Sequence, residues 1–110
     1  MISAMQVFRR WSPVALVAVR GASMSPALAP GDVVVATRGR GRAGAVVLVT
    51  WDARPGQLSV KRAVRPVGRL WHVEGDFAGA STDSRELGPA RVRGVVRWRL
   101  RPRPGRVRRT

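Results

Sequence analysis

Glycine and proline divide this chain into short apolar segments, and no long segment carries the regular apolar period of a helix. Turn-forming residues stand between the segments. Six segments of strand length are rich in valine and other apolar residues: 14–20, 33–37, 45–51, 58–64, 70–74 and 92–100. The pattern predicts an all-β fold in which the strands follow one another at barrel-like or sandwich-like spacing.

The chain has 110 residues, the length of one small domain. We expect an N-terminal arm over residues 1–12, a compact domain over residues 13–102, and a basic C-terminal tail over residues 103–110. The tail is predicted to be solvated and frayed. Inside the domain only residues 24–28 are predicted to form a helical turn, and Pro26 limits its length.

Cysteine is absent and His72 is the only histidine, which narrows the possible chemistry. Disulfides, a thiol nucleophile and metal sites built on cysteine are excluded. One histidine cannot build a histidine-rich metal site, so we expect no metal and no cofactor. The longest apolar run, residues 14–19, falls well short of the roughly 20 residues that a membrane-spanning helix needs. We therefore expect a cytoplasmic protein.

The formal net charge of +15 offers a first functional hypothesis, attraction to nucleic acid or to an anionic membrane. The aromatic residues of such a nucleic-acid-binding barrel would be Trp11, Trp51, Trp71 and Trp98. Phe8, Trp11 and the basic ends would make a peripheral membrane contact. However, 20 of the 21 basic residues are arginine, the amino-acid usage of a GC-rich genome. We favour this compositional explanation and do not expect nucleic acid as the partner.

Lys61 is the only lysine in a chain that otherwise uses arginine for positive charge. Unlike arginine, lysine can lose its proton in a protein and act as a base. Ser23 lies at the exit of a predicted strand, and a serine becomes a useful nucleophile when a base takes its proton. Two strands of one sheet can bring Ser23 and Lys61 together, whereas His72 is the weaker candidate for the base.

Three segments together resemble the type I signal peptidase family, which is related to the self-cleaving LexA-type repressors. The segments are Gly21-Ala22-Ser23-Met24-Ser25-Pro26-Ala27-Leu28 followed by Gly31-Asp32, then Lys61-Arg62, then Gly75-Asp76 with Ser81-Thr82-Asp83-Ser84-Arg85 and Gly88. Each matches one sequence box of the family, and the boxes occur in the family's order. The resemblance implies a coiled, partly open β-barrel and extends over residues 19–102, most of the expected domain.

The resemblance also implies a Ser/Lys dyad, in which Ser23 attacks the scissile carbonyl and neutral Lys61 accepts its proton. Burial would lower the pKa of Lys61 towards the working pH. The Ser23 N–H would stabilise the oxyanion, while Gly21 supplies no side-chain donor.

Other residues match supporting positions of the family. Ser81 would orient the lysine, and Asp83 and Arg85 would form an ion pair beside the site. Gly75 and Asp76 would shape a turn. For Met24 we keep two interpretations, a contact with the substrate cleft and an ordinary core residue.

Two positions depart from the family pattern. Gly44 is followed by Ala45 where the family has Gly-Asp, and Phe77 replaces an asparagine after Gly75-Asp76.

The sequence contains no segment resembling the membrane anchor of signal peptidases. It is most similar to short actinobacterial members, which include nickel-type superoxide dismutase maturation proteases. The resemblance implies a precursor protein or leader peptide as partner. Alternatives are a signal peptidase acting on exported preproteins, and the basic nucleic-acid-binding barrel. A self-cleaving repressor is disfavoured because only 22 residues precede Ser23.

Overall fold

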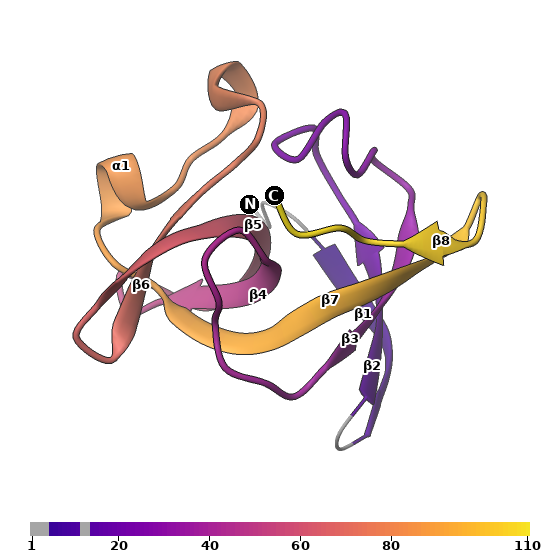
Figure 1. Cartoon of the computed structure of the whole chain (residues 1–110), viewed down its shortest axis with the longest axis horizontal. Helices are drawn as coiled ribbons and strands as arrows, with labels where there is room; N and C mark the ends of the chain where they lie inside the picture. Colours follow the sequence, from indigo (N-terminus) through magenta and orange to yellow (C-terminus); the bar gives the residue numbers. More distant parts are fainter. Residues whose placement is uncertain (1–4, 12–13) are drawn as a thin grey trace.

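An eight-stranded antiparallel sheet forms the framework of the computed structural model, which describes residues 5–11 and 14–110 (Figure 1). The strands are β1 (Met5–Trp11), β2 (Val14–Val19), β3 (Val33–Thr37), β4 (Val46–Trp51), β5 (Arg54–Val67), β6 (Leu70–Glu74), β7 (Arg91–Arg101) and β8 (Gly105–Arg106). Seven strands lie in the order β1-β2-β3-β7-β4-β5-β6, and β8 pairs with β7. The all-β prediction is therefore confirmed at this level, in a sheet that stays open.

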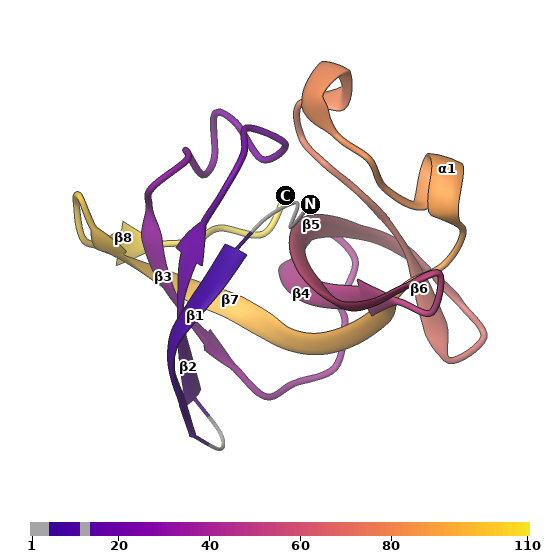
Figure 2. The ribbon, with the colours of Figure 1, turned by 180° about the vertical axis from the view of Figure 1, so that it is seen from behind.

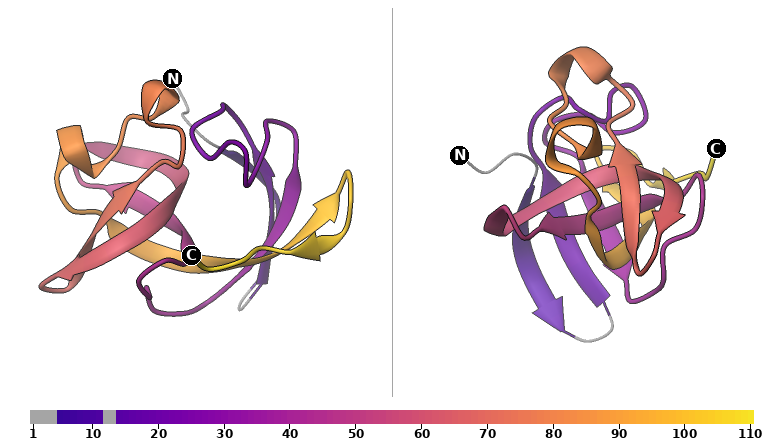
Figure 3. Two further views of the ribbon diagram at one scale, coloured as in Figure 1. Left: turned by 45° about the horizontal axis from the view of Figure 1, so that its top comes forward. Right: turned by 90° about the vertical axis from the view of Figure 1, so that its left-hand side faces the viewer.

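β7 joins the two halves of the sheet. It pairs with β3 on one side and with β4 on the other, and its long curved ribbon connects them (Figures 1 and 3). Because the sheet curls, β4 is buried on both faces. Val46 and Leu48 contribute to one apolar cluster, and Val47 and Val49 contribute to a second. A strand covered on both faces reads as a continuous apolar run, as this one does.

The six predicted strands correspond to β2 through β7, with differences at their ends. β3 has the expected bounds, whereas β5 extends beyond residues 58–64 in both directions. The extensions include exposed polar and proline residues, for which hydropathy gives no strand signal. None of the helices in the described part of the chain is long and apolar enough to cross a membrane.

Part of the expected N-terminal arm belongs to the sheet. Met5–Trp11 form β1, which pairs along its length with β2 and has one register shift. Residues 1–4 and 12 of the predicted arm lie outside the described residues.

The prediction of a frayed C-terminal tail is wrong. Pro102 and Pro104 stand in a turn that folds β8 back onto β7. The Val107 N–H then donates to the Arg97 carbonyl at 2.9 Å, and the Thr110 N–H donates to the Gly44 carbonyl at 3.0 Å. Val107 also packs against an apolar cluster, so burial of its side chain helps to hold the basic segment in place.

Two loops that are far apart in sequence come together at one end of the molecule. One connects β2 to β3, and the other leads from β6 into a 3-10 turn (Ala78–Ala80) and helix α1 (Ser84–Leu87) (Figures 1 and 2). The first loop contains the expected turn at residues 24–28, closed by a 2.9 Å hydrogen bond from the Leu28 N–H to the Met24 carbonyl. These loops carry most of the predicted site residues.

Candidate functional site

Lys61 is almost completely buried, with 1% of its surface exposed, on the central part of β5. Its Nζ atom donates a hydrogen bond to Ser81 Oγ at 3.1 Å. Burial lowers the pKa of the Lys61 amine, the charge of Asp83 acts against this shift, and the charge of Arg85 adds to it. The contact expected from the resemblance between Lys61 and Ser81 is present, in surroundings that favour a neutral amine.

Asp83 is fully buried and accepts hydrogen bonds from several donors. Ser81 Oγ lies 2.6 Å from Asp83 Oδ2, the Gly75 N–H reaches the same oxygen at 2.9 Å, and Arg85 donates from Nε at 2.9 Å and from Nη2 at 2.6 Å. Burial alone would raise the pKa of Asp83, but the hydrogen bonds from Arg85, Ser81 and Gly75 outweigh it and hold that pKa well below its usual value. The expected Asp83–Arg85 ion pair is therefore present around an ionised carboxylate.

The ionised Asp83 fixes the direction of the hydrogen-bond chain. An ionised carboxylate can only accept, so Ser81 must give its hydroxyl hydrogen to Asp83. Ser81 then accepts a hydrogen from Lys61. When the Lys61 amine is neutral, its lone pair is not used by Ser81 and is free to accept a proton from another group.

Asp83→Asn is expected to lower the free energy of unfolding by about 2 kcal/mol at pH 7, because charge-assisted hydrogen bonds to a buried carboxylate are lost. The folded pKa of Asp83 lies below the unfolded value of about 3.9. Its contribution is therefore present above pH 4 and is lost as the pH falls below it. Urea unfolding of both proteins at pH 7 and pH 3 should show the difference shrinking at the lower pH.

Asp52→Asn is the matched control for this measurement. Asp52 has a side chain that is 88% exposed and lies 3.7 Å from Arg91, so its loss should change the free energy of unfolding little. Equal destabilisation by Asp52→Asn and Asp83→Asn, or a difference as large at pH 3 as at pH 7, would contradict the assignment of Asp83 as an ionised buried anchor.

Ser23 lies in the β2–β3 loop, is 7% exposed, and contacts the loop that follows β6. Its carbonyl accepts a hydrogen bond from the Phe77 N–H at 2.8 Å. A Cβ atom placed on Gly75 would lie 2.6 Å from the Ser23 carbonyl oxygen and would also collide with the Ser81 side chain. The glycine at position 75 therefore lets the loops that carry Ser23 and Ser81 approach closely.

The structure thus joins Lys61 to Ser81 directly, and joins the Ser23 backbone to the same loop. Across the described ranges, no hydrogen bond connects the Ser23 hydroxyl to Lys61 Nζ, and the Ser23 N–H donates none. Gly21 has φ of 77°, a conformation that strains other residues. This conformation explains why that position carries no side-chain donor.

Met24 belongs to the core. It is 1% exposed and lies in the apolar cluster that includes Val17 and Val19. Of the two interpretations of this residue, the structure supports the core methionine.

Arg62 is a site residue that the sequence analysis did not assign a role. Its guanidinium pairs with Asp76 through two hydrogen bonds, Nε to Oδ1 at 3.1 Å and Nη2 to Oδ2 at 2.6 Å. Its Nη1 atom donates to the carbonyls of Gly44 at 3.1 Å and Arg108 at 2.8 Å. Asp76 therefore does more than shape a turn, because its ion pair attaches the loop after β6 to β5. Both residues stand in segments that carry the resemblance, but their separation of 14 residues does not show that they pair.

The remaining candidates lie at the edge of this network. His72 Nε2 is 2.8 Å from Glu74 Oε2 on β6, and Glu74 Oε1 lies 4.0 Å from Arg85 Nη1. The side chain of Phe77 is half exposed. Within residues 5–11 and 14–110, no three potential ligands among histidine, cysteine, aspartate and glutamate gather as a metal site.

No protein-family model, no curated protein and no solved structure matches this chain. The buried amine, the hydroxyl chain from Ser81 to Asp83 and the adjoining Ser23 loop therefore define the candidate site by their own geometry.

Proposed function

We propose that this protein is a serine endopeptidase of the signal peptidase type, with Ser23 as nucleophile and Lys61 as general base. It would remove an N-terminal leader from a precursor protein. The observation that carries the proposal is the buried Lys61 amine, held by Ser81 beside the loop that contains Ser23. This chemistry requires a lysine with a lowered pKa within reach of the serine that it deprotonates.

The reaction would proceed in two steps. Ser23 Oγ attacks the carbonyl carbon of the scissile peptide bond as its proton passes to neutral Lys61. The carbon–nitrogen bond then breaks, the leaving amine takes the proton from Lys61, and an ester remains on Ser23. A water molecule hydrolyses the ester, with Lys61 again acting as the base.

The backbone around Ser23 supplies a donor for the transition state. The Ser23 N–H is not engaged by any other described residue, so it is available to the oxyanion. An extended substrate beside the sheet would be held by main-chain hydrogen bonds, with side chains read alternately. By resemblance, small residues such as alanine would precede the cleaved bond.

Gly75→Ala is expected to lower kcat/KM by about 100-fold, because the added methyl group would push Ser81 and the Ser23 carbonyl apart. Gly79→Ala in the same loop is the matched control, since its Cβ would come no closer than 3.6 Å to the Phe77 ring. Initial rates of peptide cleavage measure the effect. Comparable rates for both variants would show that the close approach at Gly75 has no role in catalysis.

Cleavage of two precursors tests the proposal and identifies the pathway. The purified chain would be incubated with a nickel superoxide dismutase precursor, and separately with an exported preprotein in detergent, with Ser23→Ala as the blank. We expect the first precursor to be cut at one bond near its N-terminus, as mass spectrometry would show. Cleavage of the preprotein instead would assign the protein to the processing of exported proteins. Cleavage of neither precursor, or equal cleavage by Ser23→Ala, would contradict the proposal.

A further inference from the structure

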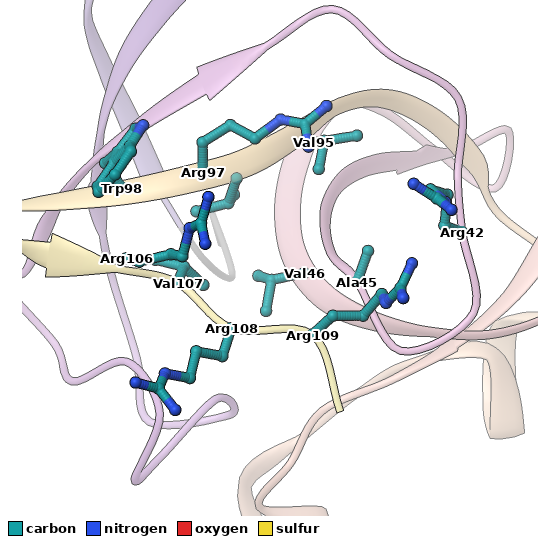
Figure 4. Close-up of a pocket in the computed structure, with 11 residues that line it drawn as sticks. Arg42, Ala45, Val46, Val95, Arg97, Trp98, Arg106, Val107, Arg108 and Arg109 are labelled. Carbon is teal, nitrogen blue, oxygen red and sulfur yellow. The ribbon is translucent and has the colours of Figure 1, made fainter.

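A groove lined by arginines lies between β7, the segment that follows it, and the residues that lead into β4 (Figure 4). Its volume is about 570 Å³. Five of its 11 lining residues are arginines: Arg42, Arg97, Arg106, Arg108 and Arg109. Arginine makes up 20 of the 110 residues of the whole chain.

The positive charge of the groove is not neutralised by the protein. No aspartate or glutamate lines it, and within the described chain none of its five arginines forms an ion pair with a carboxylate. Arg97 Nε donates to Thr37 Oγ1 at 3.2 Å, and the Arg106 guanidinium lies 5.6 Å from the centre of the Trp98 ring. Guanidinium groups without a carboxylate partner bind carboxylates or phosphates, often with two hydrogen bonds each.

The rest of the lining favours a polypeptide over a nucleic acid. Single-stranded nucleic acid binding typically uses aromatic side chains on which successive bases stack. This groove offers only Trp98 among its lining residues, and Arg106 already lies over that ring. The rest of its apolar lining is small and aliphatic. Val46 and Val95 are buried, whereas Val107 is partly exposed and can contact the side chain of a peptide.

We propose that this arginine groove binds an acidic segment of the precursor protein. The proposal rests on the proposed peptidase function for the identity of its ligand. Lys61 and Arg62 are neighbours on β5. Lys61 contacts Ser81 in the candidate site, whereas Arg62 contacts the Arg108 carbonyl at the groove. Both sites therefore belong to one small domain, and one precursor can occupy both.

Binding of a labelled peptide tests this assignment without cleavage. Fluorescence anisotropy would compare a ten-residue peptide of alternating glutamate and alanine with its glutamine counterpart, using the Ser23→Ala protein at fixed ionic strength. We expect the glutamate peptide to bind at least tenfold more tightly. Combining Arg42→Gln, Arg106→Gln and Arg109→Gln should weaken its binding about tenfold, because each exposed ion pair contributes little alone.

A control variant removes the same charge elsewhere. Arg54, Arg65 and Arg69 are exposed and do not line the groove, so their combined replacement by glutamine should change binding less than twofold. Equal weakening in both variants would overturn the proposal in favour of diffuse attraction by net charge. Tighter binding of a single-stranded oligonucleotide, lost only in the groove variant, would also overturn it by assigning the groove to nucleic acid.

Cleavage rates separate this inference from the peptidase proposal. With a precursor that carries an acidic segment, the groove variant should show a raised KM and an unchanged kcat. A neutral peptide should be cut at the parent's rate. Normal cleavage without binding of the glutamate peptide would overturn only the groove assignment. Specific binding without any cleavage would overturn only the peptidase proposal and would leave an acidic-peptide site.

Discussion

Ser23→Ala is expected to abolish cleavage, lowering kcat by roughly 10⁴-fold or more, because the substitution removes the atom that forms the ester. Binding of the precursor should change little, since the substitution deletes one oxygen atom from a residue that is only 7% exposed. Single-turnover cleavage measures the first effect, and anisotropy with labelled precursor measures the second. A slowly hydrolysed peptide ester should leave its acyl group on the parent protein, at Ser23, and leave none on the variant.

Ser25→Ala provides a control two residues away in the same loop. Ser25 is partly exposed, and its N–H donates to the Ala22 carbonyl at 3.0 Å, a bond that the substitution leaves intact. Its activity should stay within about twofold of the parent. Acyl transfer to Ser25 would exclude Ser23 as the nucleophile. Cleavage activity in Ser23→Ala that stays with the protein through further purification would exclude it as well.

The strands were predictable where an apolar run of strand length lies between turn residues. The segment at residues 33–37 is a run of valine, alanine and threonine between turn residues, and β3 has the same bounds. The outer part of β5, including Arg54 and Gln57, has no such pattern, because exposed hairpin strands are held by backbone pairing. Hydropathy records burial, so it cannot report a strand whose side chains stay in water.

Helix α1 and the C-terminal hairpin were not predicted for a related reason. α1 has four residues, fewer than a helical hydrophobic period needs, and it depends on Asp83 as its N-cap and Gly88 as its C-cap. β8 has two residues and is positioned by a turn and by the burial of Val107. Such elements are stabilised by tertiary contacts that the local sequence does not contain.

The site was predictable in its residue types and only partly in its contacts. The Asp83–Arg85 ion pair and the Lys61–Ser81 hydrogen bond were expected from the resemblance and are present. The bidentate pair between Arg62 and Asp76 was not expected, because it spans 14 residues and depends on how the loop after β6 folds over β5. Register and loop packing decide such pairs, and neither can be read from spacing alone.

Lys61→Met is the second substitution with a large expected effect. It keeps a side chain of similar length while removing the base, so cleavage should fall by roughly 10³-fold or more. The same variant should be more stable than the parent at neutral pH. Because burial lowers the pKa of folded Lys61, protonation of this amine favours the unfolded chain, and this destabilises the parent. The stability difference should shrink as the pH rises towards the unfolded value of about 10.4.

The pH profile of the parent distinguishes a catalytic Lys61 from a merely buried one. A base must be neutral, so kcat/KM should rise with pH and then level off. The midpoint of this rise should lie below the ordinary pKa of lysine. The charge of Arg85 lowers the pKa of Lys61, and therefore Arg85→Gln should move that midpoint to higher pH. Because Arg85→Gln also removes the hydrogen bonds from the Arg85 guanidinium to Asp83, urea unfolding of this variant should be measured beside its pH profile. A midpoint that stays in place in Arg85→Gln, or a profile that Lys61→Met leaves intact, would mean that another group takes the proton from Ser23.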